Sequence, residues 1–359
     1  MVGKQAKPPF RVGLTADFFD HQGEPKYRDM GLSVLDNCPE IERFSLDKHH
    51  PQLESSQLYD ANGVIVLTPS VTAETVSRAD QLLSIGRFGV GYDAVDVEAC
   101  TNADVAVFIT AGAVDRSVAE ATIAWMLALT HRVRVKDNLV RTGGWHTRSQ
   151  YMGTEIRNRV FGSIGFGGIA KATVKLLRGF GMTQPLVYDP YVDQATANEH
   201  DVRLVSLKEL LTKADFVSIH CPLTPKTRDL IGRKELACMK PSAYLLNTAR
   251  GGIVDETALG EALEEGRIAG AALDCFATEP LTEPHPLSHL DNVLFAPHCI
   301  AWTDELFQDI GQMVCRGMVD LAQGRRPHGV VNPEVFERPG FQAKWARVRT
   351  PSTDQMVLT

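Results

Sequence analysis

The chain has 359 residues, 44% of them hydrophobic, and a formal net charge of −7, which suits about two globular domains and argues against a general nucleic-acid or anionic-membrane surface. Its polar N-terminus is not expected to act as a signal peptide, and its longest apolar run, residues 118–130, is far shorter than the roughly 20 residues of a membrane span. Seven cysteines, an odd number without a CxxC pair, indicate reduced thiols in a cytoplasmic compartment.

Strands and helices alternate along the chain, which predicts an α/β fold built on parallel sheets. In the first third of the chain, residues 72–80 are expected to be helical, and apolar runs predict strands at residues 10–15, 63–67, 82–87 and 105–110.

Residues 116–141 are expected to form one long helix. Its segment 118–129 is apolar nearly all round, which predicts burial on more than one side. A helix between two domains or across a dimer interface fits this pattern better than a helix on a single core. Because large exposed apolar patches usually mark interfaces, we expect a two-fold homodimer built on this helix.

A dinucleotide fingerprint in its Gly/Ala form, Gly165-x-Gly167-x-x-Ala170, follows the apolar run that begins at Val160. Gly165 permits a tight turn, Gly167 lets the backbone approach a pyrophosphate, and Ala170 lets the next helix pack closely. Asp189 ends a second apolar run, where its carboxylate would accept hydrogen bonds from an adenosine ribose. The spacing therefore predicts NAD as the cofactor.

Residues that typically begin or end helices and strands recur after this fingerprint. Ser206 and Glu209 have the spacing of a capping box, and Gly266 is expected to end a helix. The segment from about residue 333 is rich in Pro, Arg, Gln and Thr with little periodicity, which predicts an extended tail that could wrap a neighbouring subunit. Further strands are expected at residues 216–220, 243–247 and 269–275.

Four ionisable residues follow predicted strands, at the edge where a doubly wound sheet binds its ligand: Arg250, Asp274, Glu279 and His298. An arginine fork can hold carboxylate and carbonyl oxygens, and a histidine beside a carboxylate can move a proton. This set suits hydride transfer between a nicotinamide and a 2-hydroxy or 2-oxo acid. Purely structural roles remain open for three of these residues: a surface ion pair for Arg250, a turn cap for Asp274 and a turn histidine for His298. No residues have metal-ligand spacing, so no metal is expected.

Three stretches resemble the D-isomer-specific 2-hydroxyacid dehydrogenase family. They are Asn-Thr-Ala-Arg-Gly-Gly-Ile-Val-Asp at 247–255, Ala-Ala-Leu-Asp-Cys-Phe-x-x-Glu-Pro at 271–280 and Ala-Pro-His at 296–298, within a similarity covering roughly residues 60–332. The resemblance implies a Rossmann domain, residues 111–300, inserted into a flavodoxin-like substrate domain, residues 1–110 and 301–359.

The resemblance also implies roles for individual residues. Arg250 would bind the substrate carboxylate and carbonyl, His298 would donate or accept the proton, and Glu279 would be its partner. The backbone N–H groups of Val90 and Gly91 would hold the substrate carboxylate, and Trp302 would wall the substrate pocket. Asp274 would contact the nicotinamide end of the cofactor. The full set of implied cofactor contacts is Gly165, Phe166, Gly167, Gly168, Ile169, Asp189, His220, Cys221, Pro222, Thr227, Thr248, Ala249, Asp274 and His298.

The expected substrate class depends on positions where this chain differs from some members of the family. Thr68-Pro69-Ser70 fill a loop that is arginine-rich in phosphoglycerate-using relatives, which favours a small hydroxypyruvate- or glyoxylate-like acid over 3-phosphoglycerate. The His298-x-x-Ala-Trp302 pattern is similar to hydroxypyruvate and glyoxylate reductases, and also to corepressors that sense NAD(H) as dimeric scaffolds. A corepressor-like scaffold therefore remains an alternative. A formate or phosphite dehydrogenase is a second alternative, although formate dehydrogenases have glutamine in place of Glu279.

Overall fold

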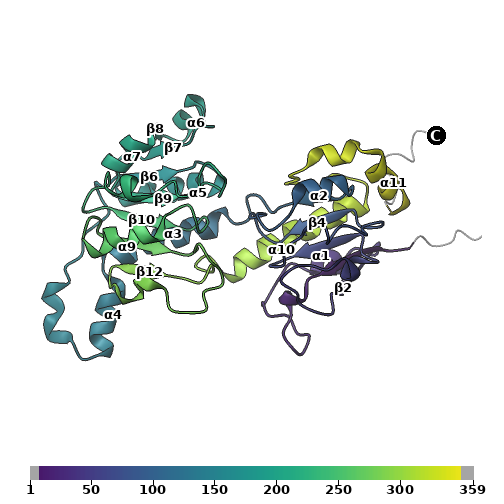
Figure 1. The fold of residues 1–359 in the computed structure, drawn as a ribbon, viewed down its shortest axis with the longest axis horizontal. Coiled ribbons are helices and arrows are strands. Elements are labelled where there is room, and N and C mark those ends of the chain that lie inside the picture. The colour runs from purple at the N-terminus through teal and green to yellow at the C-terminus, as the bar shows by residue number, and fades with distance from the viewer. Residues whose placement is uncertain (1–7, 349–359) are drawn as a thin grey trace, which may run out of the picture. The chain divides into compact units, whose positions relative to one another are not determined.

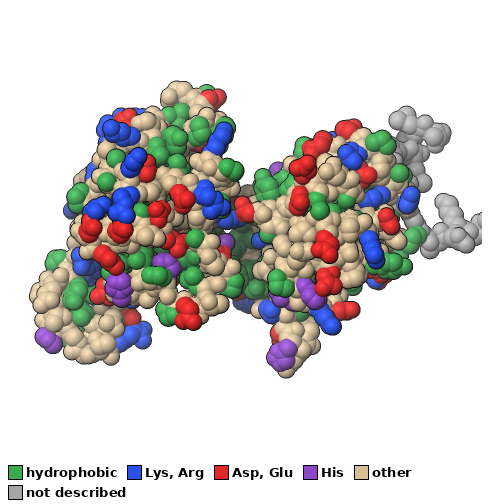
Figure 2. Space-filling view, viewed as in Figure 1, with side chains coloured by type: hydrophobic (Ala, Val, Ile, Leu, Met, Phe, Trp, Pro, Cys, Tyr) green, Lys and Arg blue, Asp and Glu red, His purple; other side chains and the backbone are tan. Residues whose placement is uncertain are grey.

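The computed structural model describes residues 8–348, which form two compact units, residues 8–114 with 303–348 and residues 115–302. Each unit is a parallel sheet with helices packed on it (Figure 1). On the face shown in Figure 2, acidic and basic side chains are interspersed, in keeping with the modest net charge. Within residues 8–348, none of the helices combines the length and apolarity needed to span a membrane.

The first unit contains a five-stranded sheet in the order β2-β1-β3-β4-β5. This order is that of flavodoxin-like doubly wound sheets, in which ligands bind at the carboxyl ends of the strands. The strands are β1 (Phe10–Leu14), β2 (Ile41–Ser45), β3 (Gly63–Val66), β4 (Ser84–Arg87) and β5 (Ala106–Phe108).

The helices of the first unit come from both ends of the chain. The long helix α10 (Asp304–Ala322) returns to pack against β4, which joins the C-terminal segment to the N-terminal sheet. The others are α1 (Ser33–Asp36), α2 (Val97–Asn102) and α11 (Pro339–Val348), with 3-10 turns at Ala16–Phe18, Ser55–Leu58 and Pro333–Glu337.

The second unit contains a seven-stranded sheet in the order β12-β11-β10-β9-β6-β7-β8. Counted from β6, this is the Rossmann order 3-2-1-4-5-6 with one added strand, and the order reverses between β6 and β9. The strands are β6 (Phe161–Ile164), β7 (Leu186–Tyr188), β8 (Arg203–Leu204), β9 (Phe216–Ile219), β10 (Tyr244–Asn247), β11 (Gly270–Leu273) and β12 (Val293–Phe295).

Helices cover both faces of this second sheet, and buried aliphatic and aromatic side chains form a core on each face. The predicted helix end at Gly266 is confirmed, since Gly266 follows α9 with a φ of 66°. The predicted capping box is confirmed in part: the Ser206 hydroxyl accepts from the Glu209 N–H at 3.2 Å, but Glu209 Oε1 accepts from Lys213 and Arg203. The helices are α3 (Asp115–Thr130), α4 (Val133–Arg141), α5 (Gly168–Leu177), α6 (Gln194–Glu199), α7 (Leu207–Lys213), α8 (Arg233–Leu236) and α9 (Glu256–Glu264), with 3-10 turns at Trp145–Gln150, Arg178–Phe180 and Pro286–His289.

The single long helix expected over residues 116–141 is wrong, because the chain breaks between α3 and α4. Arg132 has a left-handed φ of 55°, which ends the helical path. The Thr130 hydroxyl donates to the Met126 carbonyl at 2.8 Å, and the Thr130 carbonyl accepts from the Thr154 N–H at 2.9 Å. Side-chain bonds of this kind compete with helix continuation. Helix α3 itself is largely buried, against α5 and the adjacent sheet.

The helix expected at residues 72–80 is also wrong, since this segment is a series of turns. The Thr72 N–H donates to the Thr75 hydroxyl at 3.0 Å, and the Thr75 hydroxyl donates to the Leu53 carbonyl at 2.6 Å. Threonine hydroxyls thus take the bonds that helical backbone groups would make.

The extended tail expected from residue 333 is wrong as far as the structure describes it. Residues 333–348 form a 3-10 turn and α11, and their apolar side chains are buried in the first unit. The Phe336 and Phe341 ring centroids lie 4.8 Å apart, and Trp345 donates its indole N–H to the Leu321 carbonyl. Buried aromatic rings offset the polar composition that suggested a tail. Residues 349–359 of the predicted tail lie outside the described residues.

Candidate active site

The glycine loop lies between β6 and α5, at the point where the strand order reverses. Gly165 has a φ of 91°, and a Cβ there would lie 2.8 Å from the backbone nitrogen of Cys221. A Cβ on Gly167 would meet nothing within 4 Å, and Gly167 and Gly168 are exposed. Ala170 is fully buried. The loop therefore packs tightly against the end of β9, and Gly167, the N-cap of α5, stays open as a pyrophosphate site requires, while the Asp115 carboxylate lies against Gly168.

Asp189, at the end of β7, is fixed over this loop by two backbone donors. Its Oδ2 accepts from the Phe166 N–H and its Oδ1 from the Tyr191 N–H, both at 2.8 Å. The carboxylate is half-buried at the carboxyl edge of the sheet. In Rossmann folds, an acidic side chain at this place binds the ribose hydroxyls of NAD.

The segment after β9 forms an uncharged wall beside the loop. The His220 Nε2 lies 2.8 Å from the Ser218 hydroxyl, and burial lowers the pKa of His220 to about 4, so its ring is neutral at pH 7. Burial raises the pKa of Cys221 to about 11, which keeps its thiol protonated. The Thr227 hydroxyl donates to the Pro222 carbonyl at 2.6 Å and closes the turn. A neutral surface of this kind suits an aromatic base.

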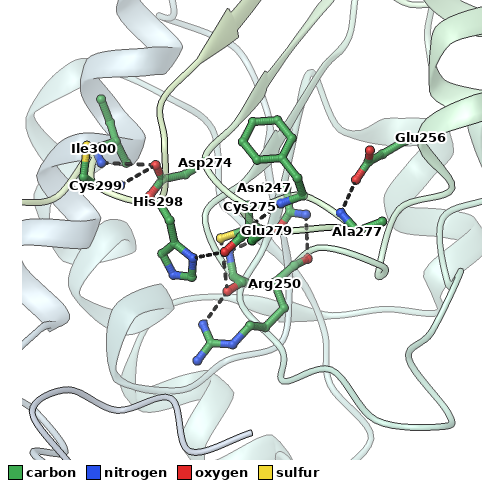
Figure 3. A network of polar contacts seen from close by, with 12 residues as sticks. Asn247, Arg250, Glu256, Asp274, Cys275, Ala277, Glu279, His298, Cys299 and Ile300 are labelled. Atoms are coloured by element: carbon green, nitrogen blue, oxygen red, sulfur yellow. Dashed lines mark hydrogen bonds and ion pairs between the residues drawn. The ribbon is translucent and has the colours of Figure 1, made fainter. Parts of the chain in front are cut away.

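Arg250 is held by the turn that follows β10 (Figure 3). The Asn247 side chain is buried, and it donates to the Arg250 carbonyl at 2.8 Å and accepts from the Ala249 N–H at 3.1 Å. The Arg250 Nη1 donates to the Ala249 carbonyl at 2.6 Å. A Cβ on Gly251 would overlap the Phe276 carbonyl, so this turn packs directly on the segment after β11. The guanidinium is thus presented from a braced backbone.

His298 and Glu279 form a hydrogen-bonded pair close to Arg250 (Figure 3). The His298 Nδ1 lies 2.7 Å from Glu279 Oε2, and Glu279 Oε1 accepts from the Phe276 N–H at 2.8 Å. Burial acts to raise the pKa of Glu279, but bonds from His298 and Phe276 and the Arg250 charge outweigh it, so this pKa lies below its ordinary value. The carboxylate therefore stays ionised and holds one imidazole nitrogen, leaving Nε2 for a proton transfer.

Asp274 positions the loop that carries His298. Its Oδ1 accepts from the backbone N–H groups of Cys299 at 2.9 Å and Ile300 at 3.1 Å, and its carbonyl accepts from the His298 N–H at 2.8 Å. Burial raises the pKa of Asp274, and the two backbone bonds oppose that effect. A buried carboxylate with these bonds fixes the left-handed backbone of His298, whose φ is 54°.

Sequence reasoning missed Glu256, at the first turn of α9. One of its carboxylate oxygens accepts from the Ala277 N–H at 2.6 Å, and the other lies 3.2 Å from the buried His285 Nε2. These bonds brace the segment that carries Glu279. The available signal was its place beside Asp255, the N-cap of α9, where a carboxylate favours the helix start.

In the first unit, Val90 and Gly91 follow β4, beside the ends of β1 and β3. The Arg87 Nη1 donates to the Phe88 carbonyl at 2.6 Å, and the Phe18 and Phe88 rings lie 5.0 Å apart. Thus the segment that the resemblance assigns to the substrate carboxylate is braced by its neighbours. Trp302 belongs to the second unit and is about half exposed.

Asp17, in the 3-10 turn after β1, is a second residue that sequence reasoning missed. Its Oδ2 accepts from the Thr68 N–H at 2.8 Å and also contacts the Thr68 hydroxyl, while its Oδ1 is buried with no hydrogen-bond partner. Thr68 lies in the loop after β3 where an arginine-rich sequence would mark a phosphate site. In this chain the Asp17 carboxylate lies at that edge of the sheet instead.

The second unit therefore brings together Arg250, Glu279, His298 and Asp274, and its residues fit a bound dinucleotide. Gly167, at the N-cap of α5, is open, and Asp189 lies at the next strand end. The Thr248 hydroxyl is buried with no hydrogen-bond partner, as expected for a group that awaits a ligand.

Comparison with known proteins gives consistent results. Residues 123–299 match the family described as D-isomer specific 2-hydroxyacid dehydrogenase, NAD binding domain. A glyoxylate reductase of Thermofilum pendens is 37% identical over 317 residues, which cover 86% of this chain and 92% of that protein. A D-3-phosphoglycerate dehydrogenase of Methanocaldococcus jannaschii is 38% identical over 311 residues, but the match spans only 58% of its length. The crystal structure of a D-lactate dehydrogenase from Aquifex aeolicus, complexed with NAD and lactic acid, matches with a TM-score of 0.74 and 26% identity, over 87% of this chain and 96% of that chain.

Proposed function

The chain belongs to the D-isomer-specific 2-hydroxyacid dehydrogenase family of NAD-dependent oxidoreductases, and on that premise we propose that it interconverts a small unphosphorylated 2-oxo acid and its D-2-hydroxy acid. The observation that carries this proposal is the Glu279–His298 pair, with its 2.7 Å contact, beside the braced guanidinium of Arg250. A cytoplasmic location remains a prediction.

The proposed roles follow from the chemistry of these side chains. NAD, when bound, supplies or accepts the hydride. Arg250 binds the substrate carboxylate and polarises the carbonyl oxygen, because its planar fork matches two oxygens. His298 gives a proton to that oxygen during reduction and takes it back during oxidation. Glu279 holds His298 Nδ1 and stabilises the imidazolium.

The substrate class is proposed from the first unit. A phosphorylated substrate carries a dianion that arginine forks bind best, but the loop after β3 has Thr68-Pro69-Ser70 with the Asp17 carboxylate beside them. That carboxylate would repel a phosphate. Relatives named glyoxylate reductase also match along 92–96% of their length. Both points favour a glyoxylate- or hydroxypyruvate-like acid.

A panel of 2-oxo acids with NADH tests this proposal. Glyoxylate and hydroxypyruvate should be reduced with a kcat/KM about tenfold to a hundredfold above that of 3-phosphohydroxypyruvate, which is the size of one lost charged hydrogen bond. A preference for the phosphorylated acid would contradict the substrate class. Tight NADH binding with no turnover of any acid would instead support the corepressor-like scaffold.

Cofactor choice gives a separate prediction. Asp189 accepts two backbone bonds at the ribose end of the site, and its sequence neighbours Pro190 and Tyr191 offer no cation for a 2′-phosphate. We expect kcat/KM for NADH to exceed that for NADPH by about tenfold to a hundredfold. Asp189→Ser should reduce the ratio of kcat/KM for NADH to kcat/KM for NADPH. Asp193→Ser, at the exposed N-cap of α6, should leave that ratio unchanged. Equal use of both cofactors by the wild type would rule out this role for Asp189.

We also propose a homodimer built on α4, the exposed part of the segment expected to mediate dimerisation. This helix and the 3-10 turn after it project from the body of their unit (Figure 1). They leave Val140 65% and Trp145 63% exposed, which is unusual for large apolar side chains near one another in the chain. Sedimentation velocity at micromolar concentration should show a dimer, and Val140→Asp should shift it to monomer. Tyr59→Asp, at a position 80% exposed in the other unit, is the control and should remain dimeric. A monomeric wild type would refute the interface.

A further inference from the structure

We propose that Cys275, Glu279 and His298 form a binding site for a divalent cation of the Zn²⁺ class, and that the bound cation reversibly inhibits the enzyme. The three residues come from separate places: Cys275 lies two residues after β11, Glu279 lies in the next segment, and His298 follows β12. No short motif contains all three, so sequence spacing could not reveal them as a set.

The geometry of the three side chains supports this site. One ligand atom from each, the Cys275 Sγ, a Glu279 carboxylate oxygen and a His298 ring nitrogen, lie within 4.8 Å of one another. In Figure 3 the Cys275 sulfur lies beside the Glu279 carboxylate, which in turn faces the His298 ring. Cys275 is buried, whereas Glu279 and His298 are exposed. The sulfur thus forms the floor of the site, and a cation can enter from solvent between the other two groups.

The donor set selects the class of cation. Thiolate, imidazole and carboxylate together are ligands for Zn²⁺ and similar borderline-soft ions, whereas Mg²⁺ and Ca²⁺ prefer oxygen ligands alone. A tetrahedral Zn²⁺ with bonds of about 2.0–2.3 Å holds its ligand atoms about 3.3–3.8 Å apart. The His298 Nδ1 and Glu279 Oε2 are now 2.7 Å apart, so they would separate slightly while the sulfur moves closer, and water would fill the fourth position.

Binding at this place would interrupt the proposed proton transfer. The cation would take His298 Nδ1 and Glu279 Oε2, the two atoms whose hydrogen bond orients the imidazole. The Cys275 thiol, now 3.5 Å from the Ala249 carbonyl, would release its proton to solvent and bind as thiolate. The added positive charge would replace the negative charge that stabilises the imidazolium. Chelation of the metal would restore the original pair, so the inhibition is reversible.

Metal binding can be tested without substrate, and so independently of the proposed function. Co²⁺ is the probe, because a thiolate–Co²⁺ bond gives a near-ultraviolet charge-transfer band that oxygen and nitrogen ligands do not. The wild-type protein should develop this band, and Zn²⁺ should abolish it by displacement. Cys275→Ser and Cys275→Val should lack the band, and Cys299→Ser, which removes the neighbouring thiol next to His298, should retain it. A wild-type protein that binds Co²⁺ without the band would overturn the proposal.

Inhibition by Zn²⁺ is measured next, and the rate of each variant is divided by the rate of the same variant without metal. The Zn²⁺ concentration that halves NADH oxidation should rise at least about tenfold in Cys275→Ser, since even outer-shell partners alter metal affinity by about 10–100-fold. Cys299→Ser should match the wild type, and EDTA should restore activity in both. Equal Zn²⁺ sensitivity of Cys275→Ser and the wild type would overturn the site. Thermal unfolding of each variant shows whether it is folded, and Cys275→Val replaces Cys275→Ser if the latter is not.

Discussion

Replacing His298 with asparagine is expected to lower kcat for 2-oxoacid reduction by about a hundredfold to ten-thousandfold, the range attributed to general acid–base catalysis. The asparagine amide can still donate to Glu279 Oε2 from about the place of Nδ1, so the loop geometry is retained. What the variant lacks is the Nε2 proton that the carbonyl oxygen must receive. NADH affinity, measured by fluorescence titration, should change little.

The control for this prediction is His285→Asn, which removes a buried histidine of the same unit that contacts Glu256 rather than substrate. His285→Asn should lower the melting temperature, and its effect on kcat should be much smaller than that of His298→Asn. Near-normal turnover by His298→Asn would show that another residue is the acid.

Replacing Glu279, the partner of His298, is expected to have a milder effect that depends on pH. Reduction requires the imidazolium form of His298, so the rate falls on the alkaline side of its pH profile. Glu279→Gln removes the charge that stabilises that form, and the alkaline limb should therefore move to lower pH. Because the pKa of Glu279 itself is lowered, its charge is present above its ordinary titration range and is lost only as pH falls through the lowered value. An unchanged pH–rate profile in Glu279→Gln would separate this residue from the acid–base step.

Most of the architecture could be predicted because its signals are local. Short apolar runs bounded by glycine, proline and polar residues gave the strands of both sheets, and the α/β class follows from their alternation with helices. The fingerprint was equally readable, since Gly165 is required by a left-handed turn and a close backbone contact that depend on few residues. Two edge strands, β2 and β8, were missed: β2 has mostly polar, exposed side chains, and β8 is only two residues long.

The parts that could not be predicted depend on distant contacts. The break at Arg132 and the turns at residues 72–80 arise where threonine hydroxyls bond to backbone groups, which helical periodicity does not report. The C-terminal segment folds because Trp345 and its aromatic neighbours are buried in the core of the first unit. Asp17 and Glu256 act through hydrogen bonds to remote loops. Their importance is visible only when the strand ends are brought together.

Arg250→Lys is expected to lower kcat/KM for 2-oxo acids by about tenfold to a hundredfold, the effect of losing one charged hydrogen bond from a bidentate pair. Lysine keeps the positive charge but lacks the planar fork that can hold a carboxylate and polarise the adjacent carbonyl together. Both kcat and KM should therefore deteriorate. Arg233→Lys, at an exposed position of helix α8 where the side chain pairs with Glu261, is the matched control and should behave as the wild type.

The specific role of Arg250 is separated from general damage by varying the substrate as well as the enzyme. Uncharged ketones lack the carboxylate, so they should be poor substrates for the wild type, and Arg250→Lys should reduce their turnover less than that of the matching 2-oxo acids. Comparing the two losses isolates the contact between guanidinium and carboxylate, in the manner of a double-mutant cycle. Equal losses for ketones and 2-oxo acids would mean that Arg250 acts on the carbonyl alone or only supports the turn after β10. The substrate carboxylate would then have to be held by other groups, and Val90 and Gly91 would be the first to examine.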